Sequence, residues 1–397
     1  MSGLNPTSRK HGKPWGEPGL PDSACPTRPG AYTGHDPMRT DVLDYELPPE
    51  RIAAYPAEPR DSARLLVVHR GEERVEHCRV RDLGSRPDLL GAGDLVVFNR
   101  SAVLPARFAA TRQGTGGRVG GLFLSAPAGD QWLVMLESRG TLRCGERLAL
   151  APEASLELLE QFGGGQWKVR VSASLGTEAL LDSIGSAPLP PYIRKRRRDL
   201  KLPEVTEADT RRYNTVYAAD PGSVAAPTAG LHFTEELLDA LERRGVRSAS
   251  VTLHVGLGTF APVRTEHLEG HPIHAEWTSV PPRTIEALED ARARGARIVP
   301  VGTTSVRALE SLPARLPRAG FTTNTRLYIT PAAPGAPAFS FRFTDRLLTN
   351  FHLPRSTLLA LVAALPGVGI ERLKGWYRIA VDREYRFYSY GDAMLFV

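Results

Sequence analysis

Ala225-Ala-Pro-Thr-Ala-Gly-Leu-His-Phe-Thr234 and His254-Val-Gly-Leu-Gly-Thr-Phe260 are the two glycine-rich turns of a stretch that begins at Tyr213 and decides the fold. The first turn precedes a helix, the second follows a strand, and each carries a histidine and a threonine. Glycine lets backbone approach a ligand closely, and a helix start offers free N–H groups to negatively charged oxygen. The two turns therefore predict the floor of a binding pocket.

Helices and strands alternate after this pocket floor. Thr234 is expected to cap a helix at 235–244, and residues 248–255 alternate as a strand with one apolar face. A helix at 284–294, a strand at 297–301 and a helix at 306–312 are expected next. Strands that alternate with helices favour an α/β core with parallel pairing.

Residues 103–181 have a different pattern from the segments on either side. Short alternating runs separated by glycine-rich turns predict a small antiparallel β-barrel or sandwich. These runs lie at 106–111, 119–124, 132–137, 147–150, 156–160 and 167–171. The predicted fold class is therefore α/β, in which residues 41–102 and 182–397 form a large mixed α/β domain and residues 103–181 form an inserted β-barrel.

The first 40 residues contain 13 glycines and prolines and show almost no apolar periodicity. Such a segment buries too little apolar surface to offset the entropy of ordering, so residues 1–40 are expected to be a disordered tail. The three cysteines, Cys25, Cys78 and Cys144, are far apart and predict neither a disulfide framework nor a zinc site.

Composition is ordinary for a globular protein, with 42% hydrophobic and 24% charged residues among 397. The sequence has no apolar run of 18 residues and no signal-peptide pattern, so we expect a cytoplasmic protein that does not enter the membrane. The net charge of +6 modestly favours a polyanionic partner. We expect a monomer.

The turn Gly302-Thr-Thr-Ser305 joins a predicted strand to a predicted helix. A glycine followed by three hydroxyls at a helix start is suited to an anion or a carboxylate, and Arg307 lies where it can add a bidentate contact. The alternative is simple capping of the helix by Thr304 or Ser305, which needs no ligand.

Three histidines, His232, His254 and His352, lie beside glycine, threonine or asparagine turns. They are either separate structural residues or parts of one polar pocket. His271 and His274 have a spacing that is weak for a metal site, because His271 precedes a proline. Dinucleotide, P-loop and α/β-hydrolase signatures are absent from the sequence.

A dense basic run, Arg194-Lys195-Arg196-Arg197-Arg198, follows the proline-rich segment 188–193, which is expected to be extended. Such a cluster fits contact with a nucleic-acid backbone. The alternative is a solvated, flexible loop.

A series of long strings runs in order from about Asp41 to Val397. These strings are Asp44-Tyr-Glu-Leu-Pro, Glu58-Pro-Arg-Asp, Val97-Phe-Asn, Pro188-Leu-Pro-Pro-Tyr-Ile, Ala225-Ala-Pro-Thr-Ala-Gly-Leu-His-Phe-Thr, Thr252-Leu-His-Val-Gly-Leu-Gly-Thr-Phe, Val301-Gly-Thr-Thr-Ser-Val-Arg, Thr349-Asn-Phe-His-Leu-Pro and Ser389-Tyr-Gly-Asp-Ala-Met. In this order they resemble the strings of the S-adenosylmethionine:tRNA ribosyltransferase-isomerases.

The resemblance implies a cytoplasmic enzyme that uses S-adenosylmethionine as co-substrate and no metal. Its members transfer and isomerise the donor's ribosyl part onto the aminomethyl group of 7-aminomethyl-7-deazaguanine in tRNA. The product is epoxyqueuosine, and adenine and methionine leave. On this chemistry the acid/base candidates are His232 and His254, with His352 in reserve. The substrate-binding candidates are Thr228, Thr259, Thr303, Thr304, Ser305, Arg307 and Asn350.

The chain departs from the family pattern at 99–103. Family members usually follow Phe-Asn with Asp-Thr-Arg-Val, whereas here Asn99 leads into Arg100-Ser-Ala-Val103. A divergent paralogue is one reading of this change, using the same donor chemistry on a deazaguanine or specialised metabolite outside tRNA. Another alternative is a homologue that binds RNA without turnover. The basic run favours RNA, and the retained histidines and hydroxyls favour an enzyme.

Overall fold

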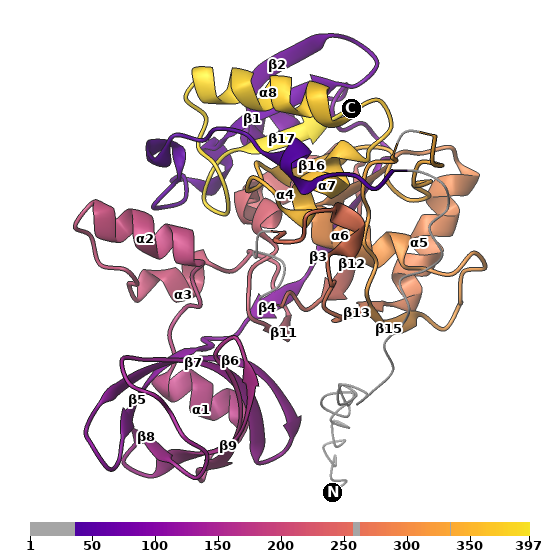
Figure 1. The fold of residues 1–397 in the computed structure, drawn as a ribbon. Helices are drawn as coiled ribbons and strands as arrows, with labels where there is room; N and C mark the ends of the chain where they lie inside the picture. The colour runs from indigo at the N-terminus through magenta and orange to yellow at the C-terminus, as the bar shows by residue number, and fades with distance from the viewer. Residues whose placement is uncertain (1–35, 257–262, 334) are drawn as a thin grey trace, which may run out of the picture. The chain divides into compact units, whose positions relative to one another are not determined.

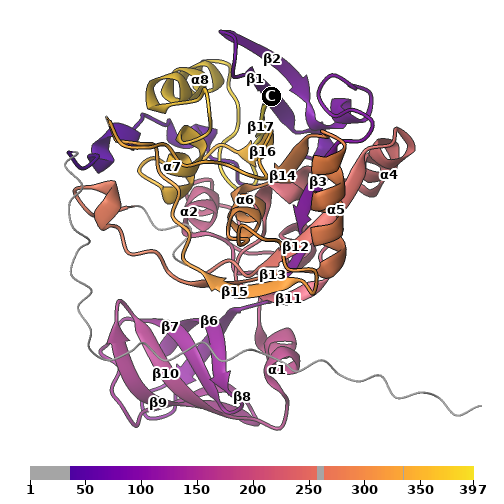
Figure 2. The ribbon, with the colours of Figure 1, turned by 90° about the vertical axis from the view of Figure 1, so that its right-hand side faces the viewer.

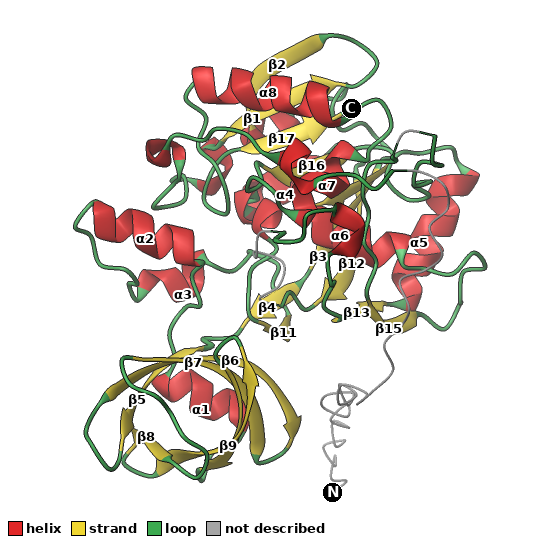
Figure 3. Cartoon of the chain, viewed as in Figure 1, coloured by secondary structure: helices red, strands yellow, loops and turns green. Residues whose placement is uncertain are grey.

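The structure is a computed structural model that describes residues 36–256, 263–333 and 335–397. These residues form two compact units, one of Ala109–Leu180 and the other of 36–108 with Leu181–Val397. Figure 1 traces the chain through both units, and Figure 3 marks their helices and strands. The predicted tail lies mostly outside the described residues, but Thr40 is buried and its N–H donates to the Glu266 carbonyl at 2.9 Å.

The larger unit contains a mixed nine-stranded sheet. Its order is β15 (Phe321–Thr325), β13 (Glu276–Val280), β12 (Arg247–Leu253), β3 (Leu95–Asn99), β14 (Ile298–Val301), β16 (Leu347–Asn350), β17 (Ala393–Phe396), β1 (Arg64–His69) and β2 (Arg74–Arg79). The parallel pairing predicted from the sequence is confirmed for β12, β3 and β14. Antiparallel pairs complete the sheet, and the C-terminal strand β17 lies between β16 and β1. A separate parallel pair joins β4 (Ser101–Val103) to β11 (Asp220–Ser223).

Side chains alternate between the two faces of the sheet along each strand, and each face packs against helices. In β3, Val96 and Phe98 face the cluster that contains α4, whereas Leu95 and Val97 face the cluster that contains α5. Helix α5 runs along β12 and β3 in Figure 2. The helices are α2 (Pro191–Asp199), α3 (Ala208–Arg212), α4 (Glu235–Arg243), α5 (Pro282–Ala293), α6 (Thr303–Glu310), α7 (Thr357–Ala363) and α8 (Ile370–Asp382).

The smaller unit is a closed antiparallel barrel, as the short alternating runs predict. Its order is β10 (Gln166–Ser172), β7 (Gln131–Ser138), β6 (Arg118–Ala128), β5 (Arg107–Arg112), β8 (Arg147–Ala151) and β9 (Ala154–Gly163). Alternate residues fill its interior, including Trp132 and Trp167, which are almost fully buried. Helix α1 (Thr177–Ile184) begins at Thr177, whose hydroxyl accepts from the Trp132 Nε1 at 3.0 Å.

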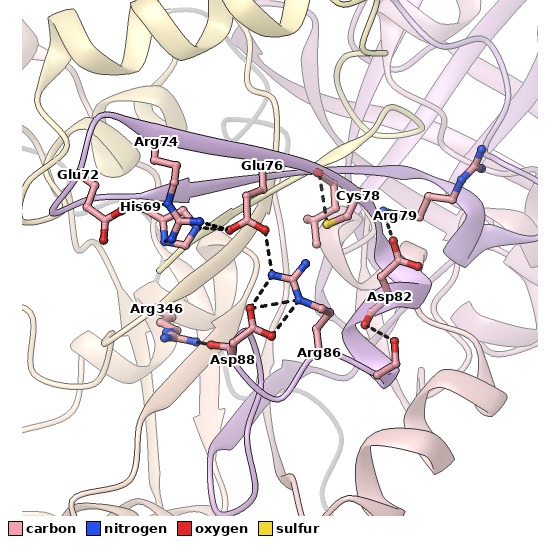
Figure 4. A network of polar contacts seen from close by, with 12 residues as sticks. His69, Glu72, Arg74, Glu76, Cys78, Arg79, Asp82, Arg86, Asp88 and Arg346 are labelled. Atoms are coloured by element: carbon pink, nitrogen blue, oxygen red, sulfur yellow. Dashed lines mark hydrogen bonds and ion pairs between the residues drawn. The ribbon is translucent and has the colours of Figure 1, made fainter.

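A charged network lies on β2, the last strand of the large sheet (Figure 4). The carboxylate of Glu76 accepts from Arg86 at 2.8 Å and from Arg74 at 2.7 Å, and it lies 2.7 Å from the Nε2 of His69. Arg86 also binds Asp88. Charged side chains on an edge strand discourage pairing with another chain, so this network protects the open edge.

Local signals that end and start elements fall where the residues predict them. The Thr234 hydroxyl caps α4 by accepting from Leu237 N–H at 3.2 Å, and Ser356 caps α7 in the same way. The expectation of an extended segment at 188–193 is wrong from Pro191 onward, because α2 starts there, and residues 194–198 lie in this helix rather than in the flexible loop of the alternative reading. Proline fits the first turn of a helix, where its missing N–H is not needed. None of the helices in the described part of the chain combines the length and hydrophobicity of a membrane span.

Candidate functional site

The turn from β14 into α6 has a geometry that requires glycine. Gly302 has a φ of +86°, a backbone conformation that residues with a Cβ rarely adopt. Thr303, Thr304 and Ser305 form the first turn of α6. The Ser305 hydroxyl donates to the Val301 carbonyl at 2.8 Å, so it has a structural partner.

A pocket opens at this turn, and its polar side chains come from three separate segments. One segment is the glycine-rich turn at 226–229, the second is the start of α6, and the third is the end of β16. Its polar lining is Thr228, Thr303, Thr304, Thr349, Asn350 and His352. The structure therefore brings together five residues that the sequence predicts for the site, since Thr349 is the only one of the six not predicted.

Hydrogen bonds hold most of the polar side chains of this lining in place, with one hydroxyl as the exception. The Thr228 hydroxyl donates to the Asn350 Oδ1 at 2.9 Å, and the Asn350 amide donates to the Tyr388 carbonyl at 3.2 Å. The Thr304 hydroxyl is buried and has no partner among the described residues. A buried hydroxyl without a partner is costly, so Thr304 is a candidate contact for a ligand.

His352 is the histidine that lines this pocket. Its Nε2 lies 2.9 Å from the Thr349 hydroxyl, and its backbone N–H donates to the Tyr377 hydroxyl at 2.9 Å. Burial lowers the pKa of His352 to about 3, because an apolar environment disfavours the charged imidazolium. The ring is therefore neutral at pH 7, where it can accept a hydrogen bond.

His232 does not line the pocket. Its Nδ1 lies 3.1 Å from the Ala229 carbonyl and its Nε2 lies 3.0 Å from the Gly391 carbonyl. Burial lowers its pKa, although both carbonyls act in the opposite direction. These contacts join the loop before α4 to the C-terminal turn, which is a structural role.

His254 also lies outside the pocket lining, although its neighbour Val255 belongs to it. Its ring stacks on Trp277, with centroids 4.9 Å apart. Burial lowers the pKa of His254 to about 4, and the charge of Asp220 opposes this shift. Asp220 in turn binds Arg100 at 2.7 and 2.8 Å, so the arginine at the divergent 99–103 turn has a carboxylate partner within the unit.

Arg307 lies in a second pocket that shares Leu358 with the first. Its Nε donates to the Leu327 carbonyl at 3.1 Å, and its Nη1 binds the carboxylate of Glu276. The sequence reasoning missed Glu276. Glu276, Thr278 and Val280 alternate along β13 and lie on its buried face. This alternation was the sequence signal that could have indicated the burial of Glu276.

The basic run divides into buried and exposed members. Arg197 is fully buried, binds Asp209 at 2.6 and 2.8 Å, and lies over the Tyr55 ring, so it is not available to phosphate in this structure. Arg198 is exposed but paired with Glu204 at 2.8 Å, and Lys195 is exposed. Arg194 and Arg196 are half-buried.

Two further predictions from the sequence concern Thr259 and the pair of His271 and His274. Thr259 lies outside the described residues, so its position relative to the pocket is not described. His271 and His274 both line the second pocket. Within the described ranges, no group of three or more histidine, cysteine, aspartate or glutamate residues is arranged to hold a metal ion.

Comparison with known proteins finds a matching family model and relatives that share one name. Residues 40–396 match the family model described as "Queuosine biosynthesis protein". The S-adenosylmethionine:tRNA ribosyltransferase-isomerase of Sorangium cellulosum is 45% identical over 90% of this chain and 98% of its own. The enzyme of that name from an Anaeromyxobacter species is 47% identical over 90% and 99%.

A solved structure is also similar to this chain. The S-adenosylmethionine tRNA ribosyltransferase of Thermotoga maritima matches with 33% identity over 90% of this chain and 100% of its own, at a TM-score of 0.49. The family match covers far more than half of the sequence, and the relatives are aligned over nearly their whole length. The chain belongs to the queuosine biosynthesis protein family.

Proposed function

We propose that this chain is an S-adenosylmethionine:tRNA ribosyltransferase-isomerase. It moves the ribosyl part of S-adenosylmethionine to the aminomethyl group of 7-aminomethyl-7-deazaguanine in tRNA and isomerises it, giving epoxyqueuosine, adenine and methionine. Relatives with 45% and 47% identity over 90% of the chain carry this name, and they do not favour a non-tRNA acceptor or a non-catalytic homologue. We further propose that it acts in the cytoplasm as a monomer.

The observation that carries the proposal is the pocket lined by Thr228, Thr303, Thr304, Asn350 and His352. A ribose presents hydroxyl groups, which require hydroxyl and amide partners in a buried site. The unpartnered Thr304 hydroxyl supplies such a group, and Thr228 with Asn350 supplies a pre-formed pair. A site whose side chains are already held by hydrogen bonds loses little entropy on binding.

Proton transfer in this pocket falls to His352. A sulfonium makes the protons on the adjacent ribose carbon more acidic, so a neutral base beside that carbon can remove one. His352 is neutral at pH 7 because burial lowers its pKa to about 3, and such a ring is a weak base, so this role requires that substrate binding raises its pKa. His254 is the second candidate, because it directly precedes the pocket residue Val255. Alanine at His254 with intact folding and unchanged turnover would remove it as a candidate.

We place the tRNA backbone against the exposed side of α2, where Lys195 and Arg198 lie. A lysine that contacts phosphate weakens binding when removed and lowers the slope of log affinity against log salt by about 1. Lys195→Ala therefore tests this placement by filter binding over a salt series. An unchanged slope would contradict it.

The decisive experiment incubates the full chain with S-adenosylmethionine and a tRNA that carries the aminomethyl base. Adenine release is followed by chromatography, with the same tRNA carrying guanine at that position as the control. Release that requires the modified tRNA supports the proposal. Release only with a small deazaguanine acceptor, or none with any acceptor, contradicts it and favours one of the two alternatives.

A further inference from the structure

Two buried hydrogen-bond donors in the second pocket lack acceptors. The Nη2 of Arg307 and the hydroxyl of Tyr328 each have no partner in the described part of the chain, and both residues line this pocket. Arg307 is only 8% exposed. Burial of a charged N–H donor without an acceptor is expensive, so a site of this kind is expected to be completed by a ligand.

The orientation of the Arg307 guanidinium is already fixed on its other sides. The Leu327 carbonyl accepts from Nε at 3.1 Å, and Glu276 accepts from Nη1. Glu276 is itself held, because its Oε1 accepts from the Gly256 N–H at 3.0 Å. Arg307 therefore presents one remaining donor in a fixed direction. Carboxylate and phosphate oxygens are the acceptors that make the strongest bonds with such a donor.

The charge of the pair restricts the kind of ligand. Glu276 already neutralises Arg307, so a simple anion would leave the buried site with a net negative charge, which is unfavourable at low dielectric. An α-amino acid brings its own ammonium group together with its carboxylate. The site therefore favours a zwitterion over a simple anion.

The position of Arg307 on α6 relates this site to the first pocket. Thr304 and Arg307 are three residues apart on one helix, which places their Cβ atoms about 5–6 Å apart on the same face. Both pockets are lined by Leu358. One ligand can therefore place a hydroxylated group at Thr304 and a carboxylate at Arg307.

We infer that Arg307 and Tyr328 bind the α-carboxylate at the amino-acid end of the donor, while the first pocket holds its ribose. Glu276 is a positioning residue that orients the guanidinium. The identity of the donor rests on the proposed function, whereas recognition of a zwitterionic amino-acid group rests on the geometry of the second pocket.

The test compares S-adenosylmethionine with its decarboxylated analogue, which keeps the sulfonium, ribose and adenine. Equilibrium binding of both compounds to the wild-type chain is measured by calorimetry, and adenine release is measured in parallel. Loss of a bond to a charged group is expected to weaken binding of the analogue at least about tenfold. Equal affinities for the two compounds, or binding of neither, would overturn the inference.

Variants of the pocket residues test whether Arg307 and Tyr328 cause the difference in affinity between the two compounds. In Arg307→Gln and Tyr328→Phe, the ratio of the two affinities is expected to fall towards one, mainly through weaker binding of the carboxylate-bearing donor. Arg112→Met is the control, because Arg112 forms an ion pair with Glu146 in the barrel and lines neither pocket. It should keep the wild-type ratio. A ratio that is retained in both pocket variants would also overturn the inference.

The binding measurement separates this inference from the proposed function. Discrimination between the two donors without any adenine release would support the carboxylate site while contradicting the proposed reaction. Adenine release that proceeds equally well with both donors would support the proposed reaction while contradicting the carboxylate site. The wild-type comparison requires no substitution, so a pocket variant that fails to fold does not remove the test.

Discussion

Two clusters of charge in the larger unit differ in how completely their groups are paired. On the edge strand β2, Glu76 is surrounded by Arg74, Arg86 and His69, and its side chain is 25% exposed (Figure 4). In the second pocket, the side chains of Glu276 and Arg307 are 4% and 10% exposed, and Nη2 of Arg307 lacks an acceptor among the described residues.

The difference separates a protective cluster from a candidate binding site. The edge network satisfies its charges with one another and with water, and exposed pairs of this kind contribute little to stability. The pocket pair has lost water and kept an unused donor, which is unfavourable for the free protein and favourable for a complex. A buried donor in a cleft that has no acceptor is therefore a candidate contact for a ligand.

The largest expected effect is a loss of turnover. It is tested by replacing one histidine in the first pocket and one in the edge network. His352→Gln removes the neutral ring from the first pocket, and loss of a general base typically lowers turnover about 10²- to 10⁴-fold. His69→Gln removes the ring beside Glu76 and should leave turnover unchanged. Single-turnover adenine release measures both. Wild-type turnover in His352→Gln would exclude His352 as the base.

The next effect is on folding stability. Glu276→Gln leaves Arg307 as an unpaired buried charge, which is expected to lower the free energy of unfolding by about 3–5 kcal/mol. Urea denaturation of this variant and of the wild type measures the loss. A loss below about 1 kcal/mol would show that Arg307 reaches water or another acceptor when its partner is removed, and would weaken the contrast between the two regions.

A third prediction concerns the two kinds of buried hydroxyl. Thr304→Val removes a hydroxyl without a partner, so stability should stay the same or rise, while kcat/KM for the donor falls about tenfold. Thr278→Val is the control, because the Thr278 hydroxyl donates to the Thr252 carbonyl at 2.9 Å. It should lower stability by about 1–3 kcal/mol and leave donor kinetics unchanged. The reverse pattern would contradict a binding role for Thr304.

A fourth prediction follows from the lowered pKa values of the buried histidines, about 3 for His352 and about 4 for His254. Both lie below the value of about 6.5 in an unfolded chain, so the unfolded state binds protons first as pH falls. Stability should therefore decrease between pH 6.5 and 5, by up to about 1.4 kcal/mol per pH unit for each group. Urea denaturation of His352→Gln should show a shallower dependence than the wild type, and an equal slope would contradict this.

Much of the fold was predictable because its signals are local. The strand at 65–68 is an unbroken apolar run, and β1 is buried on both faces as that run predicts. The barrel strands were recognisable by their spacing, and Thr234 marked a helix start. The helix at 191–199 was missed because five consecutive basic residues have no apolar periodicity, and packing of Ile193 and Arg197 against the rest of the unit overrides that local signal.

The site was predictable only where glycine turns and hydroxyls share a string. Thr303, Thr304, Asn350 and His352 meet in one pocket because the parallel strands β14 and β16 end at the same edge of the sheet, and the Thr228 hydroxyl joins them by its hydrogen bond to Asn350. The partner of Arg307 was not predictable, since Glu276 lies 31 residues away on β13 and nothing local links the two. His232 and Arg197 resemble functional residues in sequence but are buried with structural partners, and for a polar residue such partners from distant segments are not readable from the local sequence.

The smallest expected effect tests whether the edge network is only a surface feature. Glu76→Gln weakens three contacts at once, but the cations it leaves behind can turn to water, and Arg86 keeps Asp88 as a partner. Burial does not trap these charges, so the loss should be below about 1 kcal/mol and should shrink further in high salt. Urea denaturation at two ionic strengths measures this. A loss as large as that of Glu276→Gln would show that the two clusters are energetically alike, and exposure would then not distinguish a protective network from a binding site in this protein.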